Sequence, residues 1–353
     1  MYAPLLFDVA EDFFQTQKFA AARFLYESVA ESEKQQHSER LALCKYRLFN
    51  LSLGNDQIKN QHAAIQFEPY LERLDEIDQL EALKDLTNLY RSLRDWDKLE
   101  VIAKQLEKKA RVYYYSERRS DCKGSAKKTS RPIFVYVAYP YLLLGNICYE
   151  RRQFDLALQY ASLYADFDWV KETDEDTLHW KALFKEWSIA NTYVTKLFSG
   201  DESILPEYIA YFETREHEIL LGLLNIVEAA NQLYYNVDDI LQRFASNLTF
   251  YLEQQKDNPI YSPHIILDFT INLTYELADY YLRSEKYEVG YTYLLLCLEK
   301  SSINKDKSGI IKCVGLYECY KDNASFEVVY TYQNLIKEVY EHEKKISIST
   351  AVI

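Results

Sequence analysis

The amino-acid sequence predicts an all-α fold, in which long helices are joined by short connectors. Only 8 of the 353 residues are glycine and 7 are proline, whereas sheet proteins use both residues freely in their many turns. Apolar residues recur at helical spacing through most of the chain. Hydrophobic residues make up 48% of the composition, which is enough to bury a sizeable core. We therefore expect an ordered protein without strands.

A degenerate repeat groups the predicted helices into pairs. In its clearest copy, Gly145 lies near the end of a first helix, Phe154 opens a second helix nine residues later, and Ala157 follows three residues on. The small residue allows two helix backbones to approach, and the aromatic residue fills the wedge between successive pairs. Three further copies have the same spacing: Ala10 with Phe19, Thr87 with Trp96, and Ala278 with Tyr287. This spacing is that of the tetratricopeptide repeat.

Less regular apolar patterns predict helices between these copies. The expected ranges are 41–53, 63–74, 178–198, 204–212, 219–233, 240–252, 310–320 and 326–340. Connectors at 171–176, 199–203 and 255–259 contain residues that end and begin helices. Because each pair buries its apolar face on its neighbours, we expect one continuous domain over residues 1–353. Its predicted architecture is a right-handed superhelical solenoid of about seven tetratricopeptide-like pairs.

The charge balance argues against direct nucleic-acid binding. The net charge is −13 and the isoelectric point is about 5.1, whereas phosphate neutralisation needs a basic face. One segment departs from this balance: residues 108–131 contain nine basic residues against Glu117 and Asp121. We interpret it as a solvated, mobile loop near 119–132, the alternative being a docking site for an acidic partner.

Several features predict a cytoplasmic protein without a membrane partner. No apolar run approaches the roughly 18 residues of a membrane span, and the N-terminal segment lacks the basic region and cleavage site of a signal peptide. The six cysteines include no C-x-x-C pair, and most lie in apolar helical patterns. Buried free thiols fit a reducing compartment better than a disulfide framework.

The sequence does not predict an enzyme. It lacks the common phosphate-binding, zinc-protease and calcium-loop motifs, and its six histidines are scattered. Glu216, His217 and Glu218 are adjacent, and neighbours in a helix point in different directions, so they cannot hold a metal together. No local signature supports a catalytic Cys–His pair. We expect no catalytic residues, no metal and no cofactor.

The first helices of the pairs provide candidate binding residues for the inner groove. Asn88 and Asn146 directly follow the small positions, where helical periodicity turns a side chain into the groove. The amide of asparagine is donor and acceptor and so matches an extended peptide backbone, while tyrosine supplies an apolar anchor with a hydroxyl. The predicted peptide-binding residues are Lys84, Asn88, Arg91, Asn146, Tyr149, Asn225, Asn272 and Tyr275. The alternative is that the asparagines lie on solvated faces and the tyrosines only pack the repeat.

Asn88, Asn146 and the stretches LLLGN and ANQLYYNVDDILQRF resemble the tetratricopeptide region of Gram-positive peptide-pheromone-sensing regulators, the Rap, NprR and PlcR group. The resemblance implies an inner groove that holds a short extended signalling peptide by its backbone, through Asn88, Asn146, Asn225 and Asn272. Members of the group carry an N-terminal helix-turn-helix or a three-helix bundle. Repeat spacing here begins by Val9, so neither module is visible.

We therefore expect an intracellular receptor for a short peptide that controls transcription or a partner protein, with DNA binding only if a further module precedes this chain. The alternatives are a scaffold that binds a folded protein partner and a phosphatase-type regulator of a response regulator. A homodimer is compatible with the predicted solenoid.

Overall fold

The computed structural model describes residues 2–35, 38–54, 56–117, 127–253 and 263–350, and it confirms the all-α fold class. Every regular element in these ranges is a helix. The seventeen α-helices are enough for the roughly seven helix pairs that the sequence predicts. Contacts divide the chain into two compact units, Met1–Thr195 and Lys196–Ile353. A division by contacts does not test whether the units fold independently, so the expectation of one repeat domain stays a prediction.

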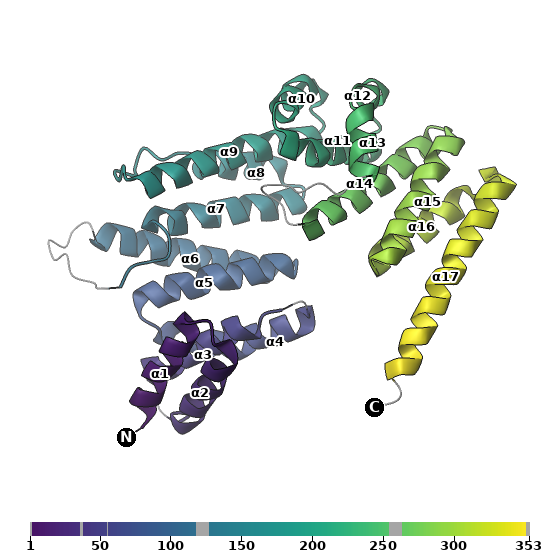
Figure 1. Ribbon diagram of the computed structural model, residues 1–353. Coiled ribbons are helices and arrows are strands. Elements are labelled where there is room, and N and C mark those ends of the chain that lie inside the picture. Colours follow the sequence, from purple (N-terminus) through teal and green to yellow (C-terminus); the bar gives the residue numbers. More distant parts are fainter. Residues whose placement is uncertain (1, 36–37, 55, 118–126, 254–262, 351–353) are drawn as a thin grey trace. The chain divides into compact units, whose positions relative to one another are not determined.

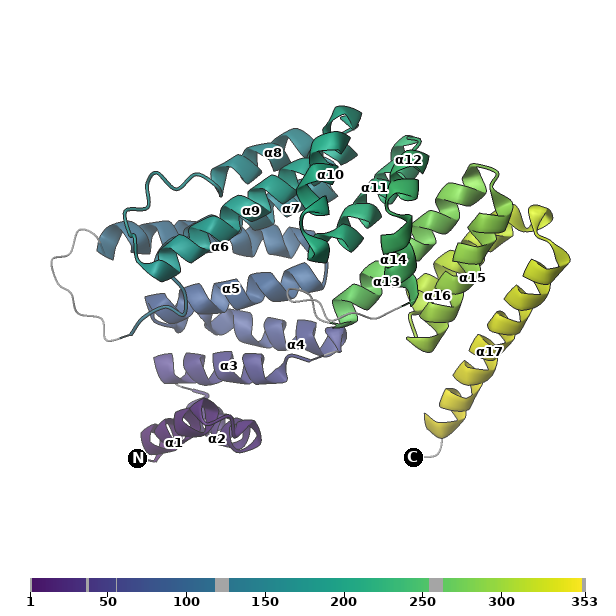
Figure 2. The same ribbon diagram turned by 45° about the horizontal axis from the view of Figure 1, so that its top comes forward.

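Unit 1 is a stack of consecutive helix pairs. The pairs follow one another in chain order, from α1 and α2 through α5 and α6 to α7 and α8 (Figures 1 and 2). Its helices are α1 (Ala3–Gln15), α2 (Phe19–Ser32), α3 (Glu39–Ser52), α4 (Gln57–Phe67), the 3-10 helix η1 (Glu68–Arg73), α5 (Glu76–Ser92), α6 (Trp96–Glu117), α7 (Ile133–Glu150), α8 (Phe154–Leu163) and α9 (Glu175–Phe198).

Unit 2 begins with short helices and ends with long ones. In it α14 packs closely against both α11 and α15. Its helices are η2 (Glu202–Ile204), α10 (Leu205–Glu213), η3 (Glu216–Glu218), α11 (Ile219–Leu233), α12 (Asp238–Arg243), α13 (Ala245–Glu253), α14 (Pro263–Arg283), α15 (Tyr287–Ile303), α16 (Lys307–Tyr320), η4 (Lys321–Asn323) and α17 (Phe326–Thr350).

The four copies of the predicted repeat share one turn geometry. In each, the residue two positions before the second helix has a positive φ: Gln17 (59°), Arg94 (53°), Arg152 (57°) and Glu285 (59°). The next backbone N–H then donates to a carbonyl of the preceding helix, from Lys18 to Phe13, Asp95 to Tyr90, Gln153 to Cys148 and Lys286 to Tyr281. Such a left-handed residue with its hydrogen bond closes a helix. The spacing read from the sequence thus corresponds to a repeated structural unit.

The small positions of the repeat are buried where paired helices meet. Ala10, Thr87 and Ala278 have no exposed surface. A Cβ atom on Gly145 would lie 3.2 Å from Cβ of Tyr160 in α8, so α7 and α8 approach closely at this residue. This agrees with the packing role predicted for the four positions.

Some predicted elements differ in their bounds. The range 63–74 starts within α4 and ends one residue past η1, and the range 240–252 is divided between α12 and α13 at the buried Phe244. The connector at 171–176 provides the expected helix start, because Asp174 accepts a hydrogen bond from the backbone N–H of Thr177 at 3.0 Å. The connector expected at 255–259 lies outside the described residues.

The basic segment is described only in part, because residues 118–126 lie outside the described residues. The described remainder is not a free loop. Lys127 forms ion pairs with Asp75, at 2.6 Å, and with Asp78. The backbone N–H of Ser130 donates to the carboxylate of Glu81 at 2.6 Å. These contacts attach residues 127–130 to α5, in place of the solvated conformation that we expected there.

The most buried helix of unit 1 is α7, with Pro140 inside it. Among the described residues, α7 is the one helix that is long and apolar enough to cross a membrane, although the sequence analysis expected none. In the structure 67% of this helix is buried by its neighbours, which is the pattern of a core helix.

Close packing at Gly290 can be tested against an unpacked glycine of the same unit. A Cβ atom on Gly290 would lie 2.7 Å from Cγ and 2.9 Å from the backbone N of Leu282. Gly290→Ala should therefore lower the free energy of unfolding by about 1–3 kcal/mol, through overpacking. Gly315 lies inside α16, and no neighbouring group lies within 4 Å of the place that its Cβ atom would take. Gly315→Ala should raise stability by about 0.5–1 kcal/mol. Urea unfolding measures both, and wild-type stability of Gly290→Ala would contradict the packing described.

Candidate functional site

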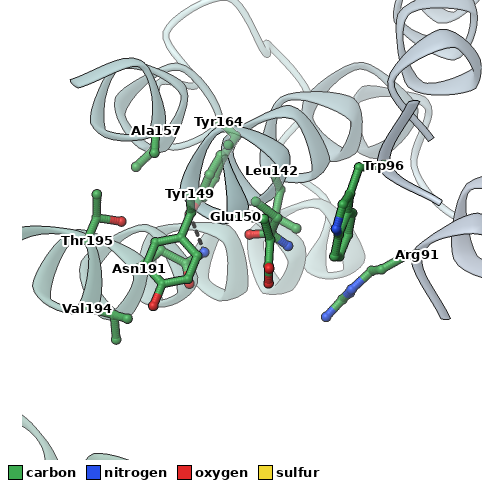
Figure 3. Close-up of a pocket in the computed structure, with 13 residues that line it drawn as sticks. Arg91, Trp96, Leu142, Tyr149, Glu150, Ala157, Tyr164, Asn191, Val194 and Thr195 are labelled. Carbon is green, nitrogen blue, oxygen red and sulfur yellow. Dashed lines mark hydrogen bonds between the residues drawn. The ribbon is translucent and has the colours of Figure 1, made fainter. Parts of the chain in front are cut away.

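A cavity of about 280 Å³ lies in unit 1, where α7, α8 and α9 meet. The C-terminal half of α7 forms one wall, α8 the second and the last turns of α9 the third (Figure 3). The lining residues are Arg91, Trp96, Leu142, Gly145, Asn146, Tyr149, Glu150, Ala157, Ala161, Tyr164, Asn191, Val194 and Thr195. Three of the predicted binding residues, Arg91, Asn146 and Tyr149, are thus brought together.

Tyr164 and Asn191 form a fixed polar wall of the cavity. The hydroxyl of Tyr164 donates to the carbonyl of Trp187 at 3.3 Å and accepts from Nδ2 of Asn191 at 2.8 Å (Figure 3). Burial raises the pKa of Tyr164 to about 12, so its hydroxyl stays neutral near pH 7. Because Nδ2 of Asn191 is engaged, the orientation of this amide is held by the protein.

Asn146 is a polar group of the cavity with no hydrogen bond among the described residues. Its side chain is half-buried and forms no hydrogen bond with any residue that the structure describes. An amide has two N–H donors and one carbonyl acceptor. Asn146 therefore presents a complete set of donors and acceptors to whatever enters the cavity.

Two charged side chains of opposite sign stand at the rim. Arg91, in the last turn of α5, and Glu150, the last residue of α7, are both exposed. Within the described ranges neither forms an ion pair. The guanidinium of Arg91 lies beside the hydroxyl of Tyr139 and opposes the rise that burial causes in the pKa of that tyrosine.

Lys84 and Asn88 are engaged elsewhere in unit 1. The ammonium of Lys84 is paired with Glu81 at 2.8 Å and with Asp85 at 3.8 Å, and its side chain is only 12% exposed. Asn88 accepts a hydrogen bond from the hydroxyl of Tyr139 at 2.6 Å. Neither residue lines the cavity, so the structure does not bring the whole predicted set together.

The remaining predicted residues belong to unit 2. Nδ2 of Asn225 donates to the hydroxyl of Tyr208 at 2.9 Å. Asn272 is exposed, and its Nδ2 donates to the carbonyl of Asp268 in its own helix at 2.9 Å. Tyr275 is half-buried, with Nζ of Lys312 5.3 Å from the centre of its ring. Both asparagines thus have partners within the protein.

The sequence analysis missed the contribution of α9, because this helix lies outside the four recognisable copies. Asn191 and Thr195 line the cavity and are separated by one helical turn, as are Trp187 and Asn191. A helical projection of the predicted range 178–198 would have placed these residues on one face. Glu150 was also missed, and Trp96 was recognised only as a packing residue.

The described residues contain no group of three or more His, Cys, Asp or Glu that could hold a metal ion. No protein-family model matches the chain, and no curated protein matches it. The pheromone-sensing resemblance therefore rests on the residues quoted for it, and the absence of enzymatic activity stays a prediction.

Unit 2 contains a carboxylate with an unusual environment next to Tyr275. Oε2 of Glu276, on α14, accepts a hydrogen bond from Nδ2 of Asn231, on α11, at 2.7 Å. Burial raises the pKa of Glu276 to about 7, and the nearby Glu228 and Asp279 add to this rise, while the hydrogen bond from Asn231 and the charge of Lys312 oppose it. The contact between α11 and α14 therefore contains a carboxyl group that is half-protonated near neutral pH.

This environment predicts a pH-dependent stability that Glu276→Gln should remove. The pKa of an unperturbed glutamate is about 4.5 and that of Glu276 is about 7. The stabilising contribution of the protonated group is therefore complete below pH 4.5 and is lost as the pH rises through about 7. Relative to wild type, Glu276→Gln should gain up to about 3 kcal/mol between pH 5 and pH 8 in urea unfolding.

The control for this experiment is Glu299→Gln, at an exposed position of α15. It should follow the wild-type pH dependence. If Glu276→Gln also followed it, the assignment of the titrating group would be wrong.

Proposed function

We propose that this chain binds an extended peptide segment and that the cavity beside Asn146 holds one anchoring residue of it. The observation that carries the proposal is the half-buried amide of Asn146, which has no hydrogen-bond partner among the described residues. An extended peptide offers alternating N–H and C=O groups that match such an amide. The other predicted asparagines, Asn88, Asn225 and Asn272, are hydrogen-bonded within the protein.

The cavity is large enough for one anchoring residue of a peptide. Sites for drug-sized molecules and cofactors occupy roughly 300–1,000 Å³, and this cavity has about 280 Å³. It accepts one or two amino-acid residues, while the rest of the ligand stays outside. Trp96 and Tyr149 at its edge are residue types that supply much of the binding energy of interfaces.

The cellular role that we propose follows the resemblance found in the sequence: a cytoplasmic receptor whose peptide ligand regulates transcription or a partner protein. The buried free thiols of Cys44, Cys148, Cys297 and Cys313 suit a reducing compartment. A scaffold for a folded partner would use the same cavity for a protruding loop. A phosphatase-type regulator would need a surface for a response regulator, for which we identify no residues.

Substitution of Asn146 tests the proposal. Heptapeptides selected from a random phage library on the wild-type protein provide the ligand, and fluorescence polarisation measures its affinity. Asn146→Ala should weaken binding by roughly 5- to 150-fold, because an unmade hydrogen bond in a desolvated site costs about 1–3 kcal/mol. The melting temperature should change by only a few degrees, since this side chain has no hydrogen-bond partner among the described residues.

The matched control is Asn272→Ala, which removes an exposed asparagine that is satisfied within its own helix. It should bind the selected peptide like wild type. Failure to select any peptide, or equal affinity of Asn146→Ala and wild type, would contradict the proposal. If Asn272→Ala lost binding while Asn146→Ala kept it, the peptide site would be in unit 2.

A further inference from the structure

The two charged groups at the rim of the cavity differ from their neighbours in having no partner of opposite charge. Arg151, the residue after Glu150, is paired with Asp97 at 2.6 Å and with Glu100 at 2.5 Å. Glu150 and Arg91 have no such pair within the residues described. Figure 3 shows both side chains among the residues that line the cavity. They are available to a ligand without the loss of any existing ion pair.

Glu150 is also placed against the electrostatic preference of its helix. It is the last residue of α7, where the partial negative charge of the helix terminus favours a cation and disfavours a carboxylate. Arg91, in the last turn of α5, has the favourable sign at such an end. A cationic ligand group beside Glu150 would neutralise the unfavourable charge.

We propose that the cavity selects its ligand by the order of the ligand's charges. In this proposal Arg91 binds a carboxylate and Glu150 binds an ammonium or guanidinium group. This inference rests on the proposed function, since it names the class of peptide that the site selects. The ligand class is an extended peptide with one acidic and one basic group on either side of the residue held in the cavity. The two fixed charges set the direction in which a given peptide lies, and the backbone contact at Asn146 then favours one of the two charge orders.

The spacing of the groups follows from helix geometry. Asn146 and Glu150 are one turn apart on α7, about 6 Å along its axis, which corresponds to two residues of an extended chain. α5 is adjacent to α7, because Asn88 of α5 is hydrogen-bonded to Tyr139 of α7. Arg91 lies three residues from Asn88, whereas Glu150 lies eleven residues from Tyr139, which is an offset of at least about 12 Å along the helices. About four or more residues of extended peptide therefore separate the two charges.

The carboxylate at Arg91 has two sources, an Asp or Glu side chain or the C-terminus of the peptide. Both present the same pair of oxygen atoms to a guanidinium. The experiment therefore includes one set of peptides in which the C-terminal carboxylate is the acidic group and another in which it is blocked.

The test uses affinity selection from defined peptide pools, read by mass spectrometry. Two pools of acetylated and amidated octapeptides carry one Glu and one Lys, separated by three to five random uncharged residues, in opposite orders. A third pool has Lys and a free C-terminal carboxylate, and a fourth has no charges. Wild type should retain one of the two Glu–Lys orders about tenfold more strongly than the other. If the C-terminal carboxylate is the acidic group, the third pool should instead be retained about tenfold more strongly than the first two.

Exchange of the two charges should invert this selection. The double variant Arg91→Glu, Glu150→Arg keeps the net charge, and it should prefer the opposite order by a similar factor. The control variant Glu213→Arg, Arg243→Glu exchanges an exposed ion pair of unit 2, whose atoms lie 2.6 Å apart, and it should select like wild type. Unchanged melting temperatures show that each variant is folded.

Three results would overturn the inference. If wild type retains all pools equally and still depends on Asn146, the cavity binds peptides without reading their charges, and only the charge inference fails. The charge inference also fails, and the proposed function stands, if the exchanged variant prefers the same charge order as wild type. If no pool is retained, the proposed function fails together with the inference.

Discussion

The close approach of α7 to α8 at Gly145 is the contact on which the cavity depends. A Cβ atom there would lie 3.2 Å from Cβ of Tyr160, so a larger residue would require Tyr160 or its helix to shift. Successive residues of a helix are turned by about 100°, and this rotation directs Asn146 away from the α8 contact and into the cavity. The packing requirement of the repeat and the position of the binding residue are therefore consequences of one contact.

Tyrosine hydroxyls engage three of the asparagines at contacts between helices. Asn88, Asn191 and Asn225 are each hydrogen-bonded to a tyrosine, namely Tyr139, Tyr164 and Tyr208. A polar group at a helix contact is costly unless it is hydrogen-bonded, so these pairs stabilise contacts between helices. An asparagine on an inward face is therefore not by itself a binding residue. Asn146 differs because no tyrosine of the described residues reaches it.

The fold could be predicted from the sequence because its signals are local. The spacing from Gly145 to Phe154 marks both the close approach and the turn at Arg152, and the same is true of Thr87, Trp96 and Arg94. The site could be predicted only in part, because it depends on distant partners. Asn88 and Tyr139 are 51 residues apart, and no local sequence pattern predicts a hydrogen bond between such distant residues. The residues that α9 contributes to the cavity could not be predicted for a different reason, since the sequence of α9 departs from the repeat.

The central claim is that a ligand satisfies the amide of Asn146. Nuclear magnetic resonance of protein with ¹⁵N-labelled asparagine measures this directly, because each side-chain amide gives its own pair of signals. On titration with a peptide selected on the wild-type protein, the Asn146 signals should shift in a saturable way, while those of Asn225 and Asn272 stay in place. Shifts of the Asn225 or Asn272 signals without a shift of Asn146 would contradict the account.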